Sequence, residues 1–142
     1  MSKEAFEISS GDVLPSYPYL WGWQRDQGED AGRKDRPVCV AIASRDGNGL
    51  THLALLPISG TPPMAGQTAI EVPPLEIRRI GLREHKQAWI TVSEYNYDIL
   101  ERSFVLEPPR RPLKKLSPQF LKIVLQAVRK SLASSTARID RV

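Results

Sequence analysis

The sequence predicts a small, mainly β barrel with short helical additions and one amphipathic helix at its C-terminal end. Five or six short apolar segments of strand length occur between residues 11 and 106, and only brief helical patterns interrupt them. After Ser117 the apolar residues recur at helical spacing instead. The 142 residues are the size of one ordinary domain. We therefore expect a barrel domain over residues 1–107, followed over 108–142 by a basic, proline-rich linker and the helix.

The most strongly predicted element is a β-hairpin near the middle of the chain. The proline after Arg36 fixes its own backbone and pushes Arg36 into an extended conformation, so a strand can begin at this step. Residues 38–43 are rich in β-branched side chains and too few for a helix, which predicts a buried strand. Turn residues occupy 45–49, and 53–58 is the predicted return strand. This pairing would bring Ser59 to the same edge as Arg36.

Shorter segments complete the predicted barrel. A proline-containing edge or bulged strand is predicted over Gly11–Tyr19, a short strand over Thr68–Val72, a strand over Trp89–Val92 that continues through Tyr95 and Tyr97, and a last strand over Ser103–Leu106. Residues 75–82 are predicted to form a helical turn with Ile77 and Ile80 inward and Arg78 and Arg79 outward.

The C-terminal segment carries the clearest helix signal. Ser117 is a favourable N-cap and Pro118 suits the first helical position. The predicted apolar stripe consists of Leu121, Val124, Leu125, Val128 and Leu132, opposite Lys122, Gln126, Arg129 and Lys130. We expect this stripe to cover its own barrel or a dimer mate, in preference to a membrane surface. Residues 133–142 are expected to fray.

The formal net charge of +4 is unevenly distributed along the chain. Residues 1–30 hold two basic and six acidic residues, residues 31–107 hold nine of each, and residues 108–142 hold nine basic and one acidic. Such a basic tail attracts phosphates or an acidic partner. The first ten residues have no apolar core of the signal-peptide type, and no apolar run approaches the length of a membrane span. We therefore expect a cytoplasmic protein that does not enter a membrane.

Few residues suggest metal or nucleophile chemistry. Cys39 lies inside an apolar strand, so we expect a buried, inert thiol and no disulfide within the chain. His52 heads a strand and His85 lies in a charged loop, so surface roles are expected for both. The sequence contains no zinc-type ligand cluster, no nucleotide-binding loop and no supporting motif for a Ser/His/Asp triad. We expect neither a metal nor a cofactor.

Trp21 and Trp23 precede a polar, glycine-containing stretch, Gln24–Asp30, that we expect to lie outside the core. The two indoles suit either buried packing or base stacking. A second loop, residues 60–66, is rich in proline and glycine and suits either a substrate wall or a simple connection.

Four short motifs, in this order and spacing, resemble those of the MazF/PemK group of toxin-antitoxin ribonucleases. The motifs are Gly11-Asp12-Val13, Ala31-Gly32, Arg36-Pro37-Val38 and Pro57-Ile58-Ser59. The resemblance covers roughly residues 11–107, judged by motif order alone. It implies an SH3-like barrel, a homodimer, an antitoxin protein as partner and sequence-preferring cleavage of single-stranded RNA. By position, the family's catalytic arginine corresponds to Arg36 and its catalytic threonine to Ser59. The chain departs from the family in having serine there and in the longer, tryptophan-containing loop between Tyr19 and Arg36.

An arginine and a hydroxyl suffice for this chemistry because RNA supplies its own nucleophile, the 2′-hydroxyl. Arg36 would stabilise charge on the phosphate, Ser59 would donate a hydrogen bond to it, and Glu29 would orient Arg36 or act as a base, a role for which Asp30 and Asp35 also qualify. The candidate RNA-binding residues are Trp21, Trp23, Arg33, Lys34 and Thr61. These assignments predict a metal-independent endoribonuclease that leaves a 2′,3′-cyclic phosphate. The alternatives are a catalytically inactive SH3-like binding module and a toxin that acts on a protein target, as the related CcdB group does.

Overall fold

The computed structural model describes residues 7–82, 84–106, 113–134 and 137–142. The strands are β1 (Asp12–Tyr17), β2 (Arg36–Arg45), β3 (Thr51–Ser59), β4 (Ala69–Glu71), β5 (Trp89–Thr91), β6 (Glu94–Ile99), β7 (Lys114–Lys115) and β8 (Ala137–Asp140). The helices are α1 (Gly22–Asp26), α2 (Pro74–Arg79), the 3-10 turn η2 (Leu100–Arg102) and α3 (Pro118–Ser134). The chain is therefore mainly β with a few helices, as predicted.

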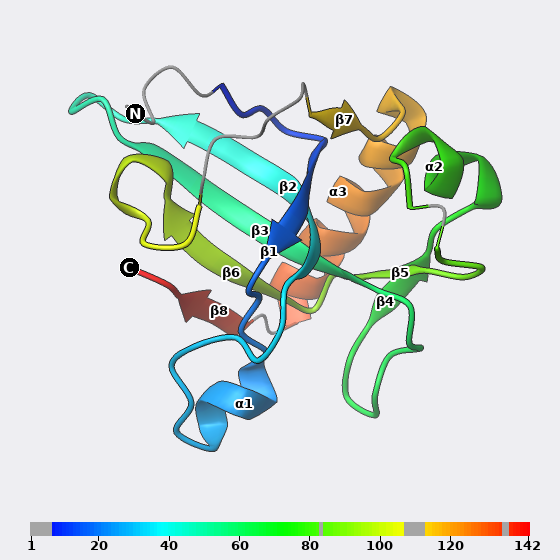
Figure 1. The fold of residues 1–142 in the computed structure, drawn as a ribbon, viewed down its shortest axis with the longest axis horizontal. Helices are drawn as coiled ribbons and strands as arrows, with labels where there is room; N and C mark the ends of the chain where they lie inside the picture. Colours follow the sequence, from blue (N-terminus) through cyan, green and yellow to red (C-terminus); the bar gives the residue numbers. More distant parts are fainter. Residues whose placement is uncertain (1–6, 83, 107–112, 135–136) are drawn as a thin grey trace.

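The predicted hairpin forms the centre of the sheet. Strands β2 and β3 pair antiparallel from Val38 opposite Pro57 to Arg45 opposite Thr51, with a register shift between Val40 and Ile42. Figure 1 shows the two strands crossing the middle of the molecule, with α3 lying across the sheet and α1 and α2 at opposite ends. Strand β1 pairs with β2 on one side and with β7 on the other, and its register shifts at the predicted proline-containing segment.

Strand β3 changes partner along its length, and this change curls the sheet. Residues His52–Leu55 pair with β6, whereas Ile58 and Ser59 pair with β5. Pro57 has no N–H to donate and lies between the two paired stretches. The result is a curled, largely antiparallel half-barrel, in which β4 and β5 form a small extension beyond the end of β3.

Two apolar clusters account for the continuous apolar run of β2. Successive side chains of a strand point to opposite faces of the sheet. Cys39 and Ala41 pack in one cluster with α2, α3, β4 and β5, while Val38 and Val40 pack in a second cluster with β1 and the start of β3. Because β2 is buried on both faces here, none of its residues in this stretch is polar.

Helix α3 covers its own sheet, which was one of the two predicted arrangements. The Ser117 hydroxyl accepts a hydrogen bond from the Phe120 N–H (3.2 Å), which confirms the N-cap. Phe120, Val124 and Val128 are buried in the same cluster as Cys39. Residues on both sides of position 107 thus contribute to one core. The side chain of Leu132, and the prolines and arginines of the predicted linker at 108–112, lie outside the described residues.

Helix α2 also follows its prediction. Ile77 and Ile80 are buried, and Arg78 and Arg79 are exposed.

Two strands predicted between residues 89 and 106 were wrong in form. The strand predicted to continue from Trp89 through Tyr97 is two strands, because β5 ends at Thr91 and β6 pairs instead with the first half of β3. Ser103–Leu106 is not a strand, since its side chains and backbone close a turn around the Ser103 hydroxyl, which accepts from the N–H groups of Val105 (3.2 Å) and Leu106 (3.0 Å).

The C-terminal residues, predicted to fray, instead form β8. This strand pairs parallel with β6, and Ile139 is fully buried. Lys114 and Lys115, predicted as linker, form β7. In both cases the local sequence is largely polar and does not indicate a strand, and the strand forms because it pairs with a neighbouring strand of the sheet.

Candidate functional site

The segment that joins β1 to α1 is held by Asn96, a fully buried side chain of β6. The Asn96 Oδ1 accepts a hydrogen bond from the Leu20 N–H (2.9 Å), and its Nδ2 donates to the Leu20 carbonyl (2.7 Å). The guanidinium of Arg141, just past β8, donates to the same Oδ1 (3.1 Å) and to the Pro18 carbonyl (2.7 Å). The backbone immediately before Trp21 is therefore clamped by two elements that lie far away in the sequence.

Glu94, also on β6, holds the next turn of this segment. Its carboxylate accepts from the Gly22 N–H (3.2 and 3.3 Å) and from the Tyr19 hydroxyl (3.3 Å). Burial raises the pKa of Glu94 above its ordinary value. A Cβ at position 22 would lie 2.7 Å from the carboxylate, so glycine lets the helix start approach it.

Residues 22–26 form the short helix α1, which includes the start of the predicted polar loop Gln24–Asp30. Gln24 is buried, against the prediction, because its Oε1 accepts from the Trp21 N–H (3.0 Å) and its backbone carbonyl accepts from Gln27 (3.1 Å) and Glu29 (3.0 Å). The helix and its clamp set the position of the Trp21 ring, which meets the Tyr19 ring edge-on with centroids 5.2 Å apart.

Arg36, the first residue of β2, packs against Trp21. Its guanidinium carbon lies 5.2 Å from the Trp21 ring centroid, within the range of a cation–π contact. The side chain is half-buried, and burial lowers its pKa. Its Nε is buried without a hydrogen-bond partner, and no carboxylate in the described part of the chain forms an ion pair with it. Such a desolvated, uncompensated cation is suited to receive an anion.

Ser59 lies at the same end of the hairpin as Arg36. The last β2–β3 pair at this end joins Val38 to Pro57. Arg36 precedes Val38 by two residues and Ser59 follows Pro57 by two, so both lie just beyond this pair. Ser59 itself pairs with Trp89 of β5, and its hydroxyl accepts from the Thr61 N–H (3.0 Å). That hydroxyl retains its own proton to donate. Among the described residues no hydrogen bond joins Ser59 to Arg36.

Glu29 binds Arg33 and not Arg36. Its carboxylate accepts from the Arg33 Nε (2.9 Å) and Nη2 (2.7 Å), and this bidentate contact lowers the pKa of Glu29. The Arg33 guanidinium carbon in turn lies 4.8 Å from the Trp23 ring centroid. Lys34 is exposed beside this group. The loop is set by Gly32, where a Cβ would lie 2.3 Å from the Pro18 carbonyl oxygen.

The predicted site residues other than Lys34 thus fall into three contacting groups. Arg36 contacts Trp21, Arg33 joins Trp23 to Glu29, and Ser59 contacts Thr61. Sequence reasoning missed Asn96 and Glu94, which position the first group. The alternation of polar residues with tyrosine in β6 indicates a strand, but it suggests that the tyrosines point inward. In the structure the polar residues of β6 are buried and the tyrosines are only partly buried.

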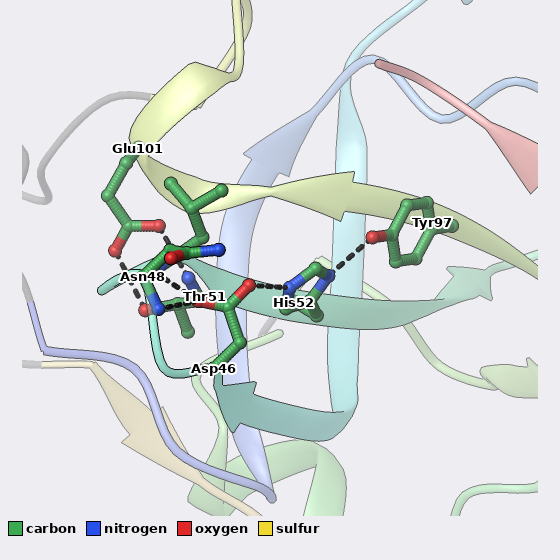
Figure 2. Close-up of polar contacts among 7 residues, drawn as sticks. Asp46, Asn48, Thr51, His52, Tyr97 and Glu101 are labelled. Carbon is green, nitrogen blue, oxygen red and sulfur yellow. Dashed lines mark hydrogen bonds and ion pairs between the residues drawn. The ribbon is translucent and has the colours of Figure 1, made fainter.

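A second polar cluster, also missed, lies at the opposite end of the hairpin (Figure 2). His52, predicted to have only a surface role, joins two elements: its Nε2 lies 2.7 Å from the Asp46 carboxylate, and its Nδ1 hydrogen-bonds with the Tyr97 hydroxyl of β6. The hydrogen bond with His52, followed by those from the N–H groups of Leu50 and Asn48, lowers the pKa of Asp46 to about 2. Glu101 accepts from the Thr51 N–H (2.6 Å) and hydroxyl (2.7 Å). The cluster fastens the hairpin turn to β6 and η2.

No group of three or more His, Cys, Asp or Glu side chains suited to holding a metal ion occurs in residues 7–82, 84–106, 113–134 and 137–142. Within these same ranges, no helix has the length and apolar character needed to cross a membrane.

Compared with known proteins, the chain matches no protein-family model, and no curated protein is significantly similar to it. The resemblance to MazF/PemK toxins therefore rests on the motifs and their placement alone.

Proposed function

We propose that this protein is the toxin component of a toxin-antitoxin system and cleaves single-stranded RNA without a metal ion. The observation that carries the proposal is Arg36: its half-buried guanidinium packs against Trp21 and has no anionic partner among the described residues, and it lies at the end of the hairpin that also carries Ser59. The curled, mainly β sheet covered by a C-terminal helix is compatible with the SH3-like barrel of the MazF/PemK group.

The proposed reaction uses the nucleophile that RNA contains. The 2′-oxygen attacks the adjacent phosphorus, the bond to the 5′-oxygen breaks, and the proton lost from the 2′-hydroxyl is balanced by one delivered to the leaving oxygen. The products are a 2′,3′-cyclic phosphate and a 5′-hydroxyl. Arg36 binds two phosphate oxygens through its planar fork and stabilises the added charge, and the Ser59 hydroxyl donates to a non-bridging oxygen.

The surrounding loop residues are proposed to bind the RNA strand. Trp21 and Trp23 each hold an arginine against the ring, and aromatic and arginine side chains together are typical of single-strand binding. Lys34 and Thr61 add an exposed cation and an exposed polar residue. Because Glu29 is already paired with Arg33, we assign it the positioning of Arg33 in place of the predicted role on Arg36.

We further propose an acidic antitoxin protein and a homodimer as the partners of this chain in the cytoplasm. The basic excess of residues 108–142 supports attraction to an acidic partner. The homodimer follows from the family resemblance. Analytical ultracentrifugation tests it: a dimer is expected at micromolar concentration, and a monomer that persists at high micromolar concentration contradicts it.

The test of the activity is an RNA cleavage assay in EDTA. A mixed-sequence single-stranded RNA is the substrate, and the same strand with 2′-O-methyl groups is the matched control, because it lacks the nucleophile. Cleavage of the first strand only, with cyclic-phosphate ends, supports the proposal. Cleavage that appears only on addition of magnesium contradicts it. RNA binding without any cleavage favours an inactive SH3-like binding module, and the absence of both favours a toxin that acts on a protein.

A further inference from the structure

A pocket of about 500 Å³ lies beside α2. It is lined by Pro74, Ile77, Arg78, His85 and Lys86. Three of these five side chains carry basic nitrogen and the other two are apolar. The two cationic side chains, Arg78 and Lys86, form no ion pair with any described residue.

The acidic residue on α2 does not neutralise this charge. The Glu76 carboxylate is buried and turned to other partners: it accepts from the Ser117 N–H (2.8 Å) and lies 3.6 Å from the Arg79 Nε. Arg79 does not line the pocket. Two consecutive arginines on one short helix therefore differ in role, since Arg79 has a carboxylate partner and Arg78 faces the pocket without one.

His85 connects this pocket to the Ser59 turn. A Cβ built on Gly60 would lie 2.9 Å from the His85 Cδ2 and 3.4 Å from its Nε2, so the edge of the imidazole that carries these atoms rests against the residue that follows Ser59. The opposite nitrogen, Nδ1, is buried and has no hydrogen-bond partner among the described residues. The loop that carries Lys86 then leads into β5, where Trp89 pairs with Ser59.

The chemistry of the pocket favours a phosphate group. Arg78 and Lys86, which have no ion-pair partner among the described residues, offer charge-assisted hydrogen bonds to an anion, and both are exposed. His85 adds a ring nitrogen that has no hydrogen-bond partner among these residues. An RNA strand that reaches Ser59 has further phosphates on either side of the cleaved bond, and the pocket begins at the adjoining residue.

We propose that the pocket formed by Arg78, His85 and Lys86 is a phosphate-binding subsite that holds the RNA strand at a phosphate flanking the cleavage point. This inference rests on the proposed function, because it takes Ser59 as part of the cleavage site. It assigns binding and strand positioning to these residues, and leaves the chemical step to Arg36 and Ser59.

The experiment measures binding separately from cleavage. Fluorescence anisotropy with a labelled, mixed-sequence 2′-O-methyl single strand gives the affinity at several salt concentrations, since this strand cannot be cleaved. Arg78→Ala and Lys86→Ala are compared with Arg79→Ala, which removes the same charge from the adjacent residue of α2. His85→Phe keeps a ring against Gly60 and removes the nitrogens. Cleavage of unmodified RNA is measured with the same proteins.

We expect Arg78→Ala and Lys86→Ala each to weaken binding about tenfold, the effect of losing a charge-assisted contact. The slope of log affinity against log salt should fall by roughly 0.7, the value for one phosphate of a single strand. KM for cleavage should rise with kcat unchanged, and Arg79→Ala should match the wild type.

The outcomes separate the two proposals. If Arg78→Ala, Lys86→Ala and Arg79→Ala all bind the strand as tightly as the wild type, and the wild type cleaves RNA, the subsite is refuted and the proposed function stands. If the pocket variants lose binding as expected but the wild type never cleaves RNA, the proposed function is refuted and the pocket remains a phosphate site. If the wild type binds no RNA, both fail.

Discussion

Removing the Asn96 side chain should strongly destabilise the fold, because this one amide satisfies both backbone groups of Leu20. Asn96→Ala leaves the Leu20 N–H and carbonyl buried without partners, and also removes an acceptor of Arg141. Each buried, unsatisfied group costs about 1–3 kcal/mol. We therefore expect Asn96→Ala to lower the free energy of unfolding by about 3 kcal/mol or more. Asn96→Asp should also destabilise, since it keeps the acceptor but loses the donor to the Leu20 carbonyl.

Urea unfolding followed by tryptophan fluorescence measures this loss. With m values of about 1–3 kcal/mol/M in urea, the midpoint should fall by at least about 1 M. Asn48→Ala is the matched control, because Asn48 is exposed in the β2–β3 turn and its side chain forms no hydrogen bond with the described residues, whereas its backbone N–H donates to Asp46. A free energy of unfolding for Asn96→Ala within about 1 kcal/mol of the wild-type value would refute the role assigned to Asn96, because that loss is no larger than the usual effect of a point mutation.

Three further predictions follow from buried or closely packed positions. Burial raises the pKa of Cys39 from 9.0 to about 12, so at pH 8 its thiolate fraction in the folded protein is roughly 1,000-fold lower than that of an ordinary cysteine. Cys39 should therefore react with a thiol reagent only in denaturant, and rapid labelling of the folded protein contradicts this. Gly32→Ala places a Cβ 2.3 Å from the Pro18 carbonyl oxygen and should lower the free energy of unfolding by about 1–3 kcal/mol, whereas Gly47→Ala, with no atom within 4 Å of its Cβ, should change this free energy little. Equal stability of the two variants argues against the packing at Gly32. Ser59→Ala should slow RNA cleavage, by less than loss of Arg36 does, while Ser59→Thr should be nearly silent because it keeps the hydroxyl; a strong loss in Ser59→Thr contradicts the assigned role.

Local patterns were sufficient to predict the hairpin, α2 and α3. Each depends on neighbours in the sequence: the proline after Arg36, the turn residues at 46–49 and the Ser117 cap act within a few positions. The burial of Val38–Ala41 on both faces also follows from an uninterrupted apolar run.

Long-range polar contacts were not predictable in the same way. The polar residues of β6 point inward because they hydrogen-bond with buried groups of Tyr17, Leu20 and Gly22. These partners lie more than 70 residues away in the sequence, so no local pattern indicates the contacts. Strand β8 forms because β6 offers an edge for it to pair with, although Arg138 and Asp140 are charged and Ile139 is its only large apolar residue. The partner of Glu29 was misassigned for a different reason: Arg33 and Arg36 both follow Glu29 in one loop, and only the fold shows that Arg33 is the partner.

The central claim is that Arg36 stabilises the charge on a phosphate of RNA during metal-independent cleavage. Single-turnover cleavage of single-stranded RNA in EDTA tests it with Arg36→Ala and Arg36→Lys. Arg45→Ala is the control, since Arg45 is an exposed arginine at the other end of β2. We predict that Arg36→Ala slows cleavage by at least about 100-fold, the effect of losing one preorganised transition-state donor. Arg36→Lys should restore little, because an ammonium group lacks the bidentate fork, and Arg45→Ala should cleave like the wild type. A correctly folded Arg36→Ala protein that cleaves RNA at the wild-type rate would contradict the claim.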